Sequence, residues 1–281
     1  MPNQVTILKA TGEREPFNRL KLLASLHKSG ASPSISENVV DHIEKELVNE
    51  MTTEDIYKHA FAILSASKTP AAGRYSLRRS LAALGPSGYP FEKFVAEIFK
   101  RQGLETMTGQ IIRGSCATHE IDVVAWNNEK LIFVEAKFHN EYYLKSDLKV
   151  ALYIKARWDD LKEIKHSFGH SFGAKRSMDE GWLVTNTKFT SSAIEYSKCT
   201  NVKLVGWNYP EKGNLQNMIE AAGLHPITCL TSLLSNEKQE LLRQGVVLCK
   251  NIRSENVLKN IGVPTERIAV IMKESDMLCP V

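Results

Sequence analysis

The sequence predicts an α/β sandwich around a mixed β-sheet, with a small α+β domain before it and a helical tail after it. Three observations lead to this prediction. Residues 131–137 form a run that is apolar on both faces up to its end, which is typical of a central strand. Helical and strand-like patterns alternate from residue 91 to residue 207, as in α/β folds. The segment 85–90, Gly-Pro-Ser-Gly-Tyr-Pro, is rich in turn residues and marks a linker.

Length and composition limit the class of protein. At roughly 150 residues per domain, 281 residues correspond to two domains, or to three small ones. The 43% hydrophobic and 24% charged content excludes a disordered, collagen-like or disulfide-scaffold chain. No apolar run approaches the ~20 residues that cross a bilayer, and no secretory signal is present. We therefore expect a cytoplasmic protein without membrane contact, and its five cysteines, none spaced as C-x-x-C, are expected to be reduced.

The first region, residues 1–88, is expected to be an α+β domain. Thr11-Gly12-Glu13 is a turn between two strand-like segments. Asn18 has the features of a helix N-cap, and Gly30 ends the helix that follows. The expected elements, in chain order, are strands over residues 4–9 and 15–17 and helices over residues 18–30, 36–47, 53–64 and 71–84.

The second region, residues 89–223, is expected to form the sandwich. Gly103 ends its first helix, and the tight turn Asn127-Asn128-Glu129 joins two strands into a hairpin. The expected elements are a helix over 91–103, strands over 105–113, 121–126 and 131–137, a helix over 146–165, a strand over 181–186, a helix over 191–199 and a strand over 202–207.

The tail, residues 224–281, is expected to be helical in short pieces. Gly245 and Gly262 separate the pieces. Two interpretations stay open. The glycine breaks are compatible with helix-hairpin-helix elements, which bind DNA phosphates through backbone amides at helix N-termini. The favoured interpretation is a helical cap that packs on the rest of the protein. The expected helices cover residues 228–234, 236–244, 254–261 and 265–273.

One group of residues can carry chemistry. Glu135 and Lys137 close the buried strand on the same face, because side chains alternate along a strand. Asp122 lies on the partner strand of the hairpin. Two carboxylates suit a hard cation such as Mg²⁺ or Mn²⁺, the carbonyl of Ala136 offers a third oxygen, and a lysine can orient a water molecule. The alternative is a structural ion pair at a strand end.

The acidic-x-Lys pattern alone has little weight, because the chain contains four such triplets. The other three begin at Asp147, Asp160 and Glu163 and lie in the segment that is expected to be helical. Charges at that spacing on a helix are usually a solvated face. Only the triplet at Glu135 follows an apolar strand and has an aspartate on the preceding strand.

Four features of this region are Phe91-Glu92, the Gly103 cap, Glu120-Ile-Asp122 and Phe133-Val-Glu135-Ala-Lys137. Together they resemble the PD-(D/E)xK nuclease superfamily, particularly its Mrr-like and Holliday-junction-resolvase-like branch. The similarity covers about residues 89–210. It implies a restriction-endonuclease-like fold and a metal-dependent nuclease acting on DNA. It also implies that a glutamate near the start of the first helix supports the metal site. Glu92 matches that position, and Glu97 is the other candidate.

The first region resembles the ATP-cone, the nucleotide-binding regulatory module of ribonucleotide reductases. The resemblance rests on Val5–Lys9, Gly12, Phe17–Lys21, the helix start at Thr53 and Ala72-Gly-Arg-Tyr75. It implies that ATP or dATP is bound by Lys9 and Lys21 at the phosphates, beside the Gly12 turn, and by Thr53 and Tyr57 near the base. Ala10 departs from the family, which usually has a second basic residue there. The alternative is a helical interaction domain without nucleotide.

The combined hypothesis is a Mg²⁺-dependent DNA endonuclease regulated by ATP or dATP, expected as a homo-oligomer. A different class of protein stays open as an alternative, namely a nucleotide-sensing, DNA-binding protein whose nuclease fold is inactive. The intact set of Asp122, Glu135 and Lys137 argues against that alternative. RNA as substrate stays open. The net charge of +4 is mild, so phosphate contacts must come from local patches.

Overall fold

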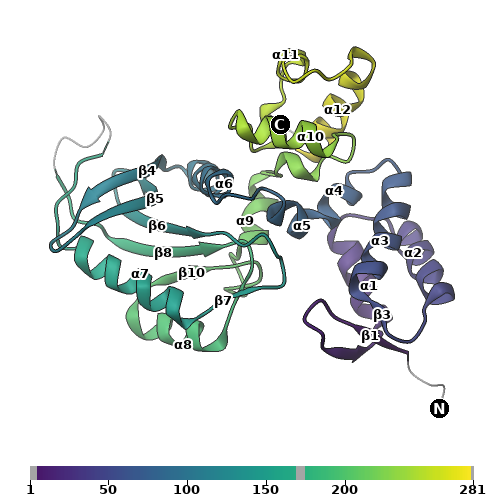
Figure 1. Cartoon of the computed structure of the whole chain (residues 1–281), viewed down its shortest axis with the longest axis horizontal. Helices are drawn as coiled ribbons and strands as arrows, with labels where there is room; N and C mark the ends of the chain where they lie inside the picture. Colours follow the sequence, from purple (N-terminus) through teal and green to yellow (C-terminus); the bar gives the residue numbers. More distant parts are fainter. Residues whose placement is uncertain (1–4, 169–174, 280–281) are drawn as a thin grey trace.

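The computed structural model describes residues 5–168 and 175–279. Figure 1 shows three parts, which are the N-terminal domain on the right, the sandwich domain on the left and the tail above them. We use these three names for residues 1–88, 89–223 and 224–281. Gln4, the expected start of the first strand, lies outside the described residues. None of the described helices is long and apolar enough to cross a membrane.

The N-terminal domain is a small sheet beside a helical bundle. Asn18 caps the first helix as predicted, because its side chain accepts the Lys21 N–H at 2.9 Å. A third strand, which pairs parallel to the first, was too short to predict from periodicity. The elements are β1 (Thr6–Leu8), β2 (Arg14–Pro16), α1 (Arg19–Lys28), α2 (Pro33–Glu46), β3 (Met51–Thr52) and α3 (Thr53–Ala66).

The helix expected over residues 71–84 is wrong as a single element. It is divided into α4 (Ala71–Tyr75) and α5 (Leu77–Ala82). At the junction the Ser76 hydroxyl donates to the carbonyl of Gly73 at 2.9 Å, a local bond that competes with regular helix. The α5 side chains also leave the core of the N-terminal domain and pack in the core that α6 shares with the tail.

The sandwich domain contains the predicted mixed sheet (Figure 1). Its strand order is β10-β8-β6-β5-β4, with β6, β8 and β10 parallel and with β4 and β5 antiparallel to their neighbours. One helix, α6, packs on β4 to β6, whereas α7 contacts β8 and α8 contacts β10. The elements are α6 (Tyr89–Arg101), β4 (Glu105–Arg113), β5 (Thr118–Trp126), β6 (Leu131–Lys137), β7 (Lys145–Ser146), α7 (Leu148–Leu161), β8 (Glu180–Thr185), β9 (Lys188–Phe189), α8 (Ser191–Thr200), β10 (Lys203–Val205) and α9 (Leu215–Ala222).

Each face of the sheet has its own apolar core. On the α6 side, Phe91, Phe94 and Phe99 are fully buried. On the α7 side, Trp158 stacks on Phe133 with ring centroids 6.4 Å apart. A Cβ atom at Gly181 would lie 2.9 Å from the Trp158 ring, so this strand position requires glycine for the helix to approach. The sheet is therefore held rigidly between two layers, and its strand ends are well positioned.

The tail is a helical cap. Its buried leucines and isoleucines belong to the same core as α5 and α6, which agrees with the favoured interpretation. The helix expected over residues 228–234 is wrong, because only a 3₁₀ turn at Ile227–Cys229 forms there. The elements are this turn, α10 (Ser235–Arg243), a second 3₁₀ turn (Cys249–Asn251), α11 (Glu255–Lys259) and α12 (Thr265–Leu278).

Candidate active site and nucleotide pocket

The candidate active site lies where strands β5 and β6 separate. Their ladder ends at the pair Val123 and Val134. Beyond that point, within the part of the chain that the structure describes, β5 pairs with β4 and β6 pairs with β8. The next residues along the two strands are Asp122 and Glu135, so the separation opens the sheet beside two carboxylates.

Asp122 is fixed by the backbone of the neighbouring strand. Its Oδ2 accepts a hydrogen bond from the N–H of Ala136 at 2.7 Å. The predicted role of Ala136 used its carbonyl oxygen, whereas the observed contact uses its amide. The amide holds the Asp122 carboxylate in one orientation.

Glu135 has a partner that the sequence did not predict. Nη1 of Arg157, on α7, donates to the Glu135 carboxylate, and Nη2 donates to the carbonyl of Glu120. The side chains of Arg157 and Glu135 are only 8% and 16% exposed. Lys137, two residues beyond Glu135 on the same face of β6, is exposed.

Arg157 could have been found from the sequence. Ala151, Ile154, Trp158 and Leu161 form the buried face of α7, and position 157 falls on that face. A cation on a buried helix face needs a carboxylate partner, because an unpaired charge there costs several kcal/mol, on the order of 3–5.

Glu92 and Glu97 on α6 have different surroundings. Glu97 forms ion pairs with Lys100 at 2.8 Å and with Lys250 of the tail at 3.3 Å. Burial raises the pKa of Glu92 to about 7, and the nearby charges of Asp122 and Glu120 contribute to this rise. The structure therefore places Glu92, rather than Glu97, beside the carboxylates at the separating strands.

The site has an excess of negative charge. Burial, as the main cause, raises the pKa of Asp122 and of Glu135 above their ordinary values. The charge of Asp122 raises the pKa of Glu135 further, against the opposing effect of Arg157. Oxygen ligands that are partly buried and repel one another fit a hard divalent cation, which removes the repulsion. The residues present therefore fit Mg²⁺ or Mn²⁺.

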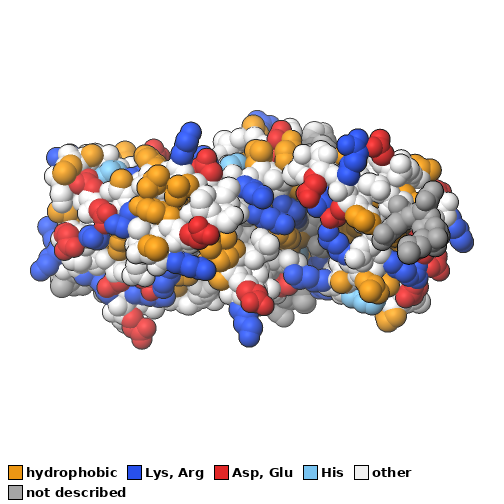
Figure 2. Space-filling model, turned by 90° about the horizontal axis from the view of Figure 1, so that it is seen from below, with side chains coloured by type: hydrophobic (Ala, Val, Ile, Leu, Met, Phe, Trp, Pro, Cys, Tyr) orange, Lys and Arg blue, Asp and Glu red, His pale blue; other side chains and the backbone are white. Residues whose placement is uncertain are grey.

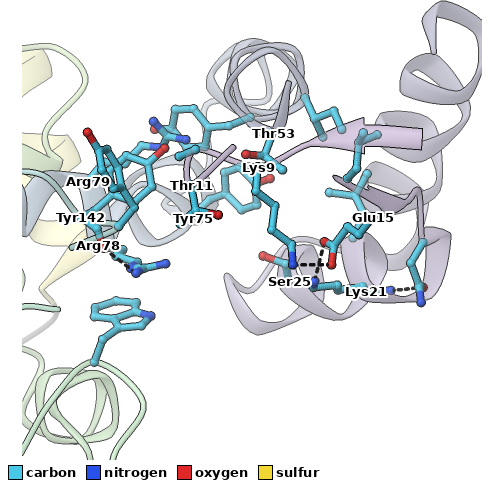
Figure 3. A pocket seen from close by; sticks show the side chains of 18 of the residues that line it. Lys9, Thr11, Glu15, Lys21, Ser25, Thr53, Tyr75, Arg78, Arg79 and Tyr142 are labelled. Atoms are coloured by element: carbon cyan, nitrogen blue, oxygen red, sulfur yellow. Dashed lines mark hydrogen bonds and ion pairs between the residues drawn. The ribbon is translucent and has the colours of Figure 1, made fainter. Parts of the chain in front are cut away.

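A second candidate site is a cavity of about 640 Å³ between the N-terminal and sandwich domains. Figure 3 shows part of its lining, with Lys9, Glu15 and Lys21 on one side and Arg78 and Tyr142 on another. Figure 2 shows Lys and Arg side chains gathered near the middle of the molecule, between the two domains. A volume of roughly 300–1,000 Å³ is usual for small-molecule sites.

Lys9 and Lys21 both line this cavity. They share one carboxylate, because Glu15 lies 2.8 Å from Nζ of Lys9 and 3.0 Å from Nζ of Lys21. Lys9 also pairs with Glu13 at 3.0 Å. Both lysines are therefore held in place by anions of the protein itself.

The other expected nucleotide residues are placed differently. Gly12 forms the predicted turn, with φ of +81°, but its N–H donates to the carbonyl of Lys9 at 2.9 Å and is not a free donor. The cap of α3 is Thr52, which binds the N–H of Asp55 at 3.0 Å. Thr53 is the first helical residue and lines the cavity, as does Tyr57. The Tyr57 ring stacks with Tyr75 and is covered by the guanidinium of Arg79.

Comparison with known proteins identifies the family. An uncharacterized protein from Archaeoglobus fulgidus is 36% identical over 183 residues, which are 64% of this chain and 97% of that protein. The crystal structure of AF1548, a protein of unknown function, matches 68% of this chain and 98% of its own, with 33% identity and a TM-score of 0.55. The chain belongs to the AF1548-like family. Residues 225–279 of this AF1548-like protein match the model of the family's C-terminal region.

The sandwich domain of the AF1548-like protein has a family assignment of its own. Residues 85–208 match the family model described as restriction endonuclease. The AF1548-like protein therefore contains a restriction-endonuclease-like domain. A more distant match, with 12% identity and a TM-score of 0.34, is to the MspJI restriction endonuclease in complex with a 27-mer oligonucleotide, and it covers 63% of this chain and 36% of that one.

Proposed function

We propose that this protein is a divalent-metal-dependent DNA endonuclease whose activity is tuned by ATP or dATP bound between its N-terminal and sandwich domains. The observation that carries the nuclease proposal is the convergence of Asp122, Glu135 and Lys137 where β5 and β6 separate. This convergence lies inside a domain that resembles restriction endonucleases.

In this proposal Asp122 and Glu135 hold Mg²⁺ or Mn²⁺, with Glu92 in support. The ion would supply charge stabilisation to the phosphodiester as negative charge develops on it. The Ala136 amide keeps the Asp122 carboxylate oriented. Lys137 is exposed beside these groups, so its ammonium can orient the attacking water and contact the phosphate.

The inactive alternative has one observation in its favour, the ion pair between Arg157 and Glu135. A cation already neutralises one of the two central carboxylates. In the active proposal this pair opens when a metal ion binds. In the inactive alternative the pair is a permanent structural contact and the domain only holds DNA.

Cleavage assays with purified variants separate the two proposals. Supercoiled, linear, nicked and branched DNA are incubated with Mg²⁺ or Mn²⁺, and DNA binding is measured in parallel. The active proposal predicts that Lys137→Ala abolishes cleavage but retains DNA binding. The matched control is Lys149→Ala, which alters an exposed lysine of another acidic-x-Lys triplet. Binding without cleavage by the wild-type protein on every substrate would favour the inactive alternative.

The nucleotide proposal is supported by the cavity that Lys9, Lys21, Thr53 and Tyr57 line. Aromatic rings and cations in one cavity fit a nucleotide, since the rings can contact the base and the cations the phosphates. Titration calorimetry of the full chain with ATP, dATP and ADP tests it. We expect binding by at least one of them, and no heat at millimolar concentration would contradict the nucleotide proposal without affecting the nuclease proposal.

A further inference from the structure

The sandwich domain forms one wall of the cavity. Tyr142, Lys145, Lys188 and Trp207 line it together with the residues of the N-terminal domain. The ATP-cone resemblance covers only the N-terminal domain and gives no role to these four residues. The wall therefore needs its own explanation.

Lys145 and Lys188 lie directly opposite each other in the two-stranded sheet of β7 and β9. Opposite residues of a pair project to the same side, and both of these line the cavity. Like charges directly across a strand pair are destabilising unless an anion separates them. Within residues 5–168 and 175–279, neither lysine has a carboxylate at ion-pair distance.

Other cations add to this repulsion. Burial and the charges of Arg78 and Lys145 lower the pKa of Lys188 below its ordinary value, and Lys21 and Lys9 act in the same direction. Arg78 donates to the carbonyl of Tyr142 at 2.5 Å, and its Nε is buried without a partner among the described residues. Lys9 and Lys21, by contrast, share the Glu15 carboxylate, and Lys9 also pairs with Glu13.

We infer that Lys145 and Lys188 of the sandwich domain, with Arg78 facing them, bind the polyphosphate of a nucleoside triphosphate and thereby clamp the two domains together. The inference rests on the proposed nucleotide regulation and specifies the residues that carry it. A nucleotide is favoured over a DNA strand because the cavity also contains tyrosines of the N-terminal domain, against which a base can pack.

The β7–β9 pair is connected to the end of the active-site strand. The Asn186 side chain accepts from the N–H of His139 at 2.9 Å and donates to its carbonyl at 2.7 Å. The His139 ring contacts the Ser146 hydroxyl at 3.0 Å. His139 is two residues beyond Lys137, so a ligand that closes on Lys145 and Lys188 acts on the segment that follows Lys137.

Calorimetric titration of the full chain with ATP and with inorganic tripolyphosphate tests the clamp. Lys145→Ala and Lys188→Ala should each lower the affinity for both ligands at least about 10-fold, as expected for the loss of a charge-assisted contact. Lys149→Ala, a nearby lysine outside the cavity, should leave both affinities unchanged. Hydrogen exchange of residues 137–147 should slow on addition of ATP in the wild-type protein and not in Lys188→Ala.

Three results would overturn the clamp. If Lys9→Ala weakens ATP binding but Lys145→Ala and Lys188→Ala do not, the nucleotide proposal stands and the clamp is wrong. If Lys188→Ala weakens DNA binding and leaves ATP unchanged, the lysine pair is a DNA contact. If the wild-type protein binds neither ATP, dATP nor tripolyphosphate, the clamp and the nucleotide proposal both fail. Two controls identify a loss of affinity that is caused by misfolding. They are the variant Lys188→Gln, which keeps a long polar side chain, and the melting temperature of each variant.

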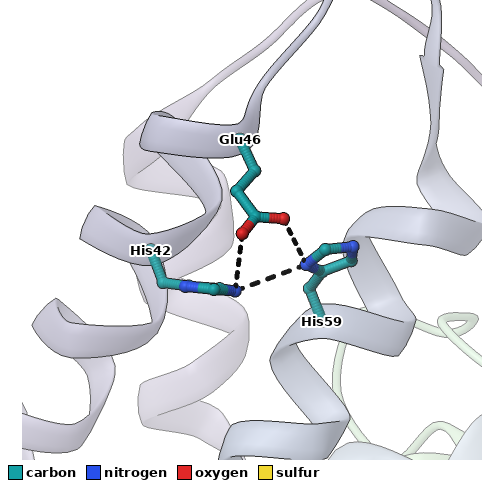
Figure 4. Close-up of side chains that lie close together, drawn as sticks. All are labelled: His42, Glu46 and His59. Carbon is teal, nitrogen blue, oxygen red and sulfur yellow. Dashed lines mark hydrogen bonds and ion pairs between the residues drawn. The ribbon is translucent and has the colours of Figure 1, made fainter.

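A different observation concerns His42, Glu46 and His59 in the N-terminal domain. Figure 4 shows the two imidazoles and the carboxylate pointing toward one another from α2 and α3. Among the described residues, this is the one group of three His, Cys, Asp or Glu side chains whose ligand atoms all lie within 4.8 Å. Nε2 of His42 lies 3.4 Å from Nδ1 of His59, and the Glu46 oxygens lie 3.8 Å and 3.3 Å from these nitrogens.

These three distances resemble the edges of a tetrahedral metal site. With metal–ligand bonds of about 2.0–2.1 Å, neighbouring ligand atoms lie about 3.3 Å apart. The geometry points to a Zn²⁺ site formed by His42, Glu46 and His59. Two imidazoles and one carboxylate suit zinc better than Mg²⁺, which prefers oxygen ligands. The side chains are 31–48% exposed, so water can complete the coordination.

Such an ion would join α2 to α3 in the N-terminal domain. The test strips the full chain of metal and titrates it with Zn²⁺ against a chromogenic chelator, in a Cys116→Ser/Cys199→Ser background because these two thiols are exposed. His42→Ala and His59→Ala should each lower the affinity for one equivalent of Zn²⁺ at least about 100-fold and abolish the effect of Zn²⁺ on the melting temperature. His27→Ala, an exposed histidine on α1, is the control. Absence of a bound equivalent in the parent protein, or its retention in the double variant His42→Ala/His59→Ala, would overturn this site.

Discussion

Arg157 on helix α7 donates a hydrogen bond to the carboxylate of Glu135 at the end of strand β6. Both groups are largely buried, and Arg157 also binds the carbonyl of Glu120 on the neighbouring strand. The guanidinium thus connects the helix layer to the two strands that carry the candidate site. In the nuclease proposal it is the counter-ion that Glu135 keeps until a metal ion replaces it.

Removal of Arg157 should therefore destabilise the metal-free protein. Arg157→Met leaves the Glu135 charge buried without a partner, and the loss is expected to be about 3–5 kcal/mol. The double variant Arg157→Met/Glu135→Gln should recover much of this loss, because the Glu135 charge is removed together with its partner. Urea unfolding in the presence of EDTA measures the free energy of unfolding of both variants. A double variant as unstable as Arg157→Met would show that an unpaired Glu135 charge is not the cause of the loss.

The half-buried carboxylate of Glu92 should make the stability of the metal-free protein fall as pH rises. Its pKa is raised to about 7 in the folded protein, from an ordinary value of 4.5. The unfolded chain releases this proton first, so stability falls as pH rises from 4.5 to about 7. At pH 8 Glu92→Gln should be more stable than wild type by ~1–2 kcal/mol, less than the full shift because the carboxylate stays partly solvated.

Glu97 on the same helix is the control for this prediction, with the opposite sign. Its ion pairs with Lys100 and Lys250 lower its pKa against the effect of burial, so its contribution is present above the ordinary pKa and is lost as pH falls. Glu97→Gln should therefore destabilise the protein at pH 8, by up to ~1 kcal/mol. Thermal or urea unfolding between pH 4.5 and 8 in EDTA shows both effects. An unchanged slope in Glu92→Gln would remove Glu92 from the carboxylate group.

Gly85 in the linker should tolerate no side chain without a shift in the segment after Lys137. A Cβ atom there would lie 2.2 Å from Oδ1 of Asn140 and 2.6 Å from the ring of Phe138. We expect Gly85→Ala to cost about 1–3 kcal/mol, as for other overpacked sites, and to lower the cleavage rate. Gly88→Ala is the control for stability alone, because the nearest atom to its added Cβ, Oε1 of Glu92, is at 3.4 Å. Wild-type stability and rate in Gly85→Ala would show that the linker moves independently of this segment.

Much of the sandwich could be predicted because its signals are local. The apolar run of β6 and the tight turn before it predict both the hairpin and the proximity of Asp122 to Glu135. The two strands β4 and β6 have the expected bounds, Glu105–Arg113 and Leu131–Lys137. The alternation of side chains along β6 then places Glu135 and Lys137 on one face.

The remaining features depend on tertiary contacts that leave little local signal. Strands β7 and β9 have two residues each, too short for any periodicity, and Lys145 meets Lys188 only through their pairing. The break at Ser76 comes from α5 packing into a second core. The cavity between the domains depends on how the two domains sit against each other, which no spacing within either domain reveals.

Deletion of the tail should unfold the rest of the sandwich domain. Residues such as Leu230, Leu241 and Ile271 are fully or almost fully buried in the core that α6 shares. Each buried side chain of this size is worth about 1.5–3 kcal/mol, so losing the set exceeds a usual total stability of about 5–15 kcal/mol. A chain that ends at residue 225 should be insoluble or lack a cooperative melting transition. A soluble truncated protein with wild-type melting would show that the tail is a separate domain.

Mg²⁺-dependent cleavage of DNA by wild type, Asp122→Ala and Lys137→Ala is the most direct test of the nuclease proposal. Residues that act as a unit lose most of the rate when one is removed, commonly by factors on the order of 10³ or more. We predict cleavage by the wild-type protein that EDTA abolishes, loss of cleavage in both variants although each still unfolds cooperatively, and full activity in Lys149→Ala. Cleavage by purified Asp122→Ala at the wild-type rate would contradict this assignment of the active site.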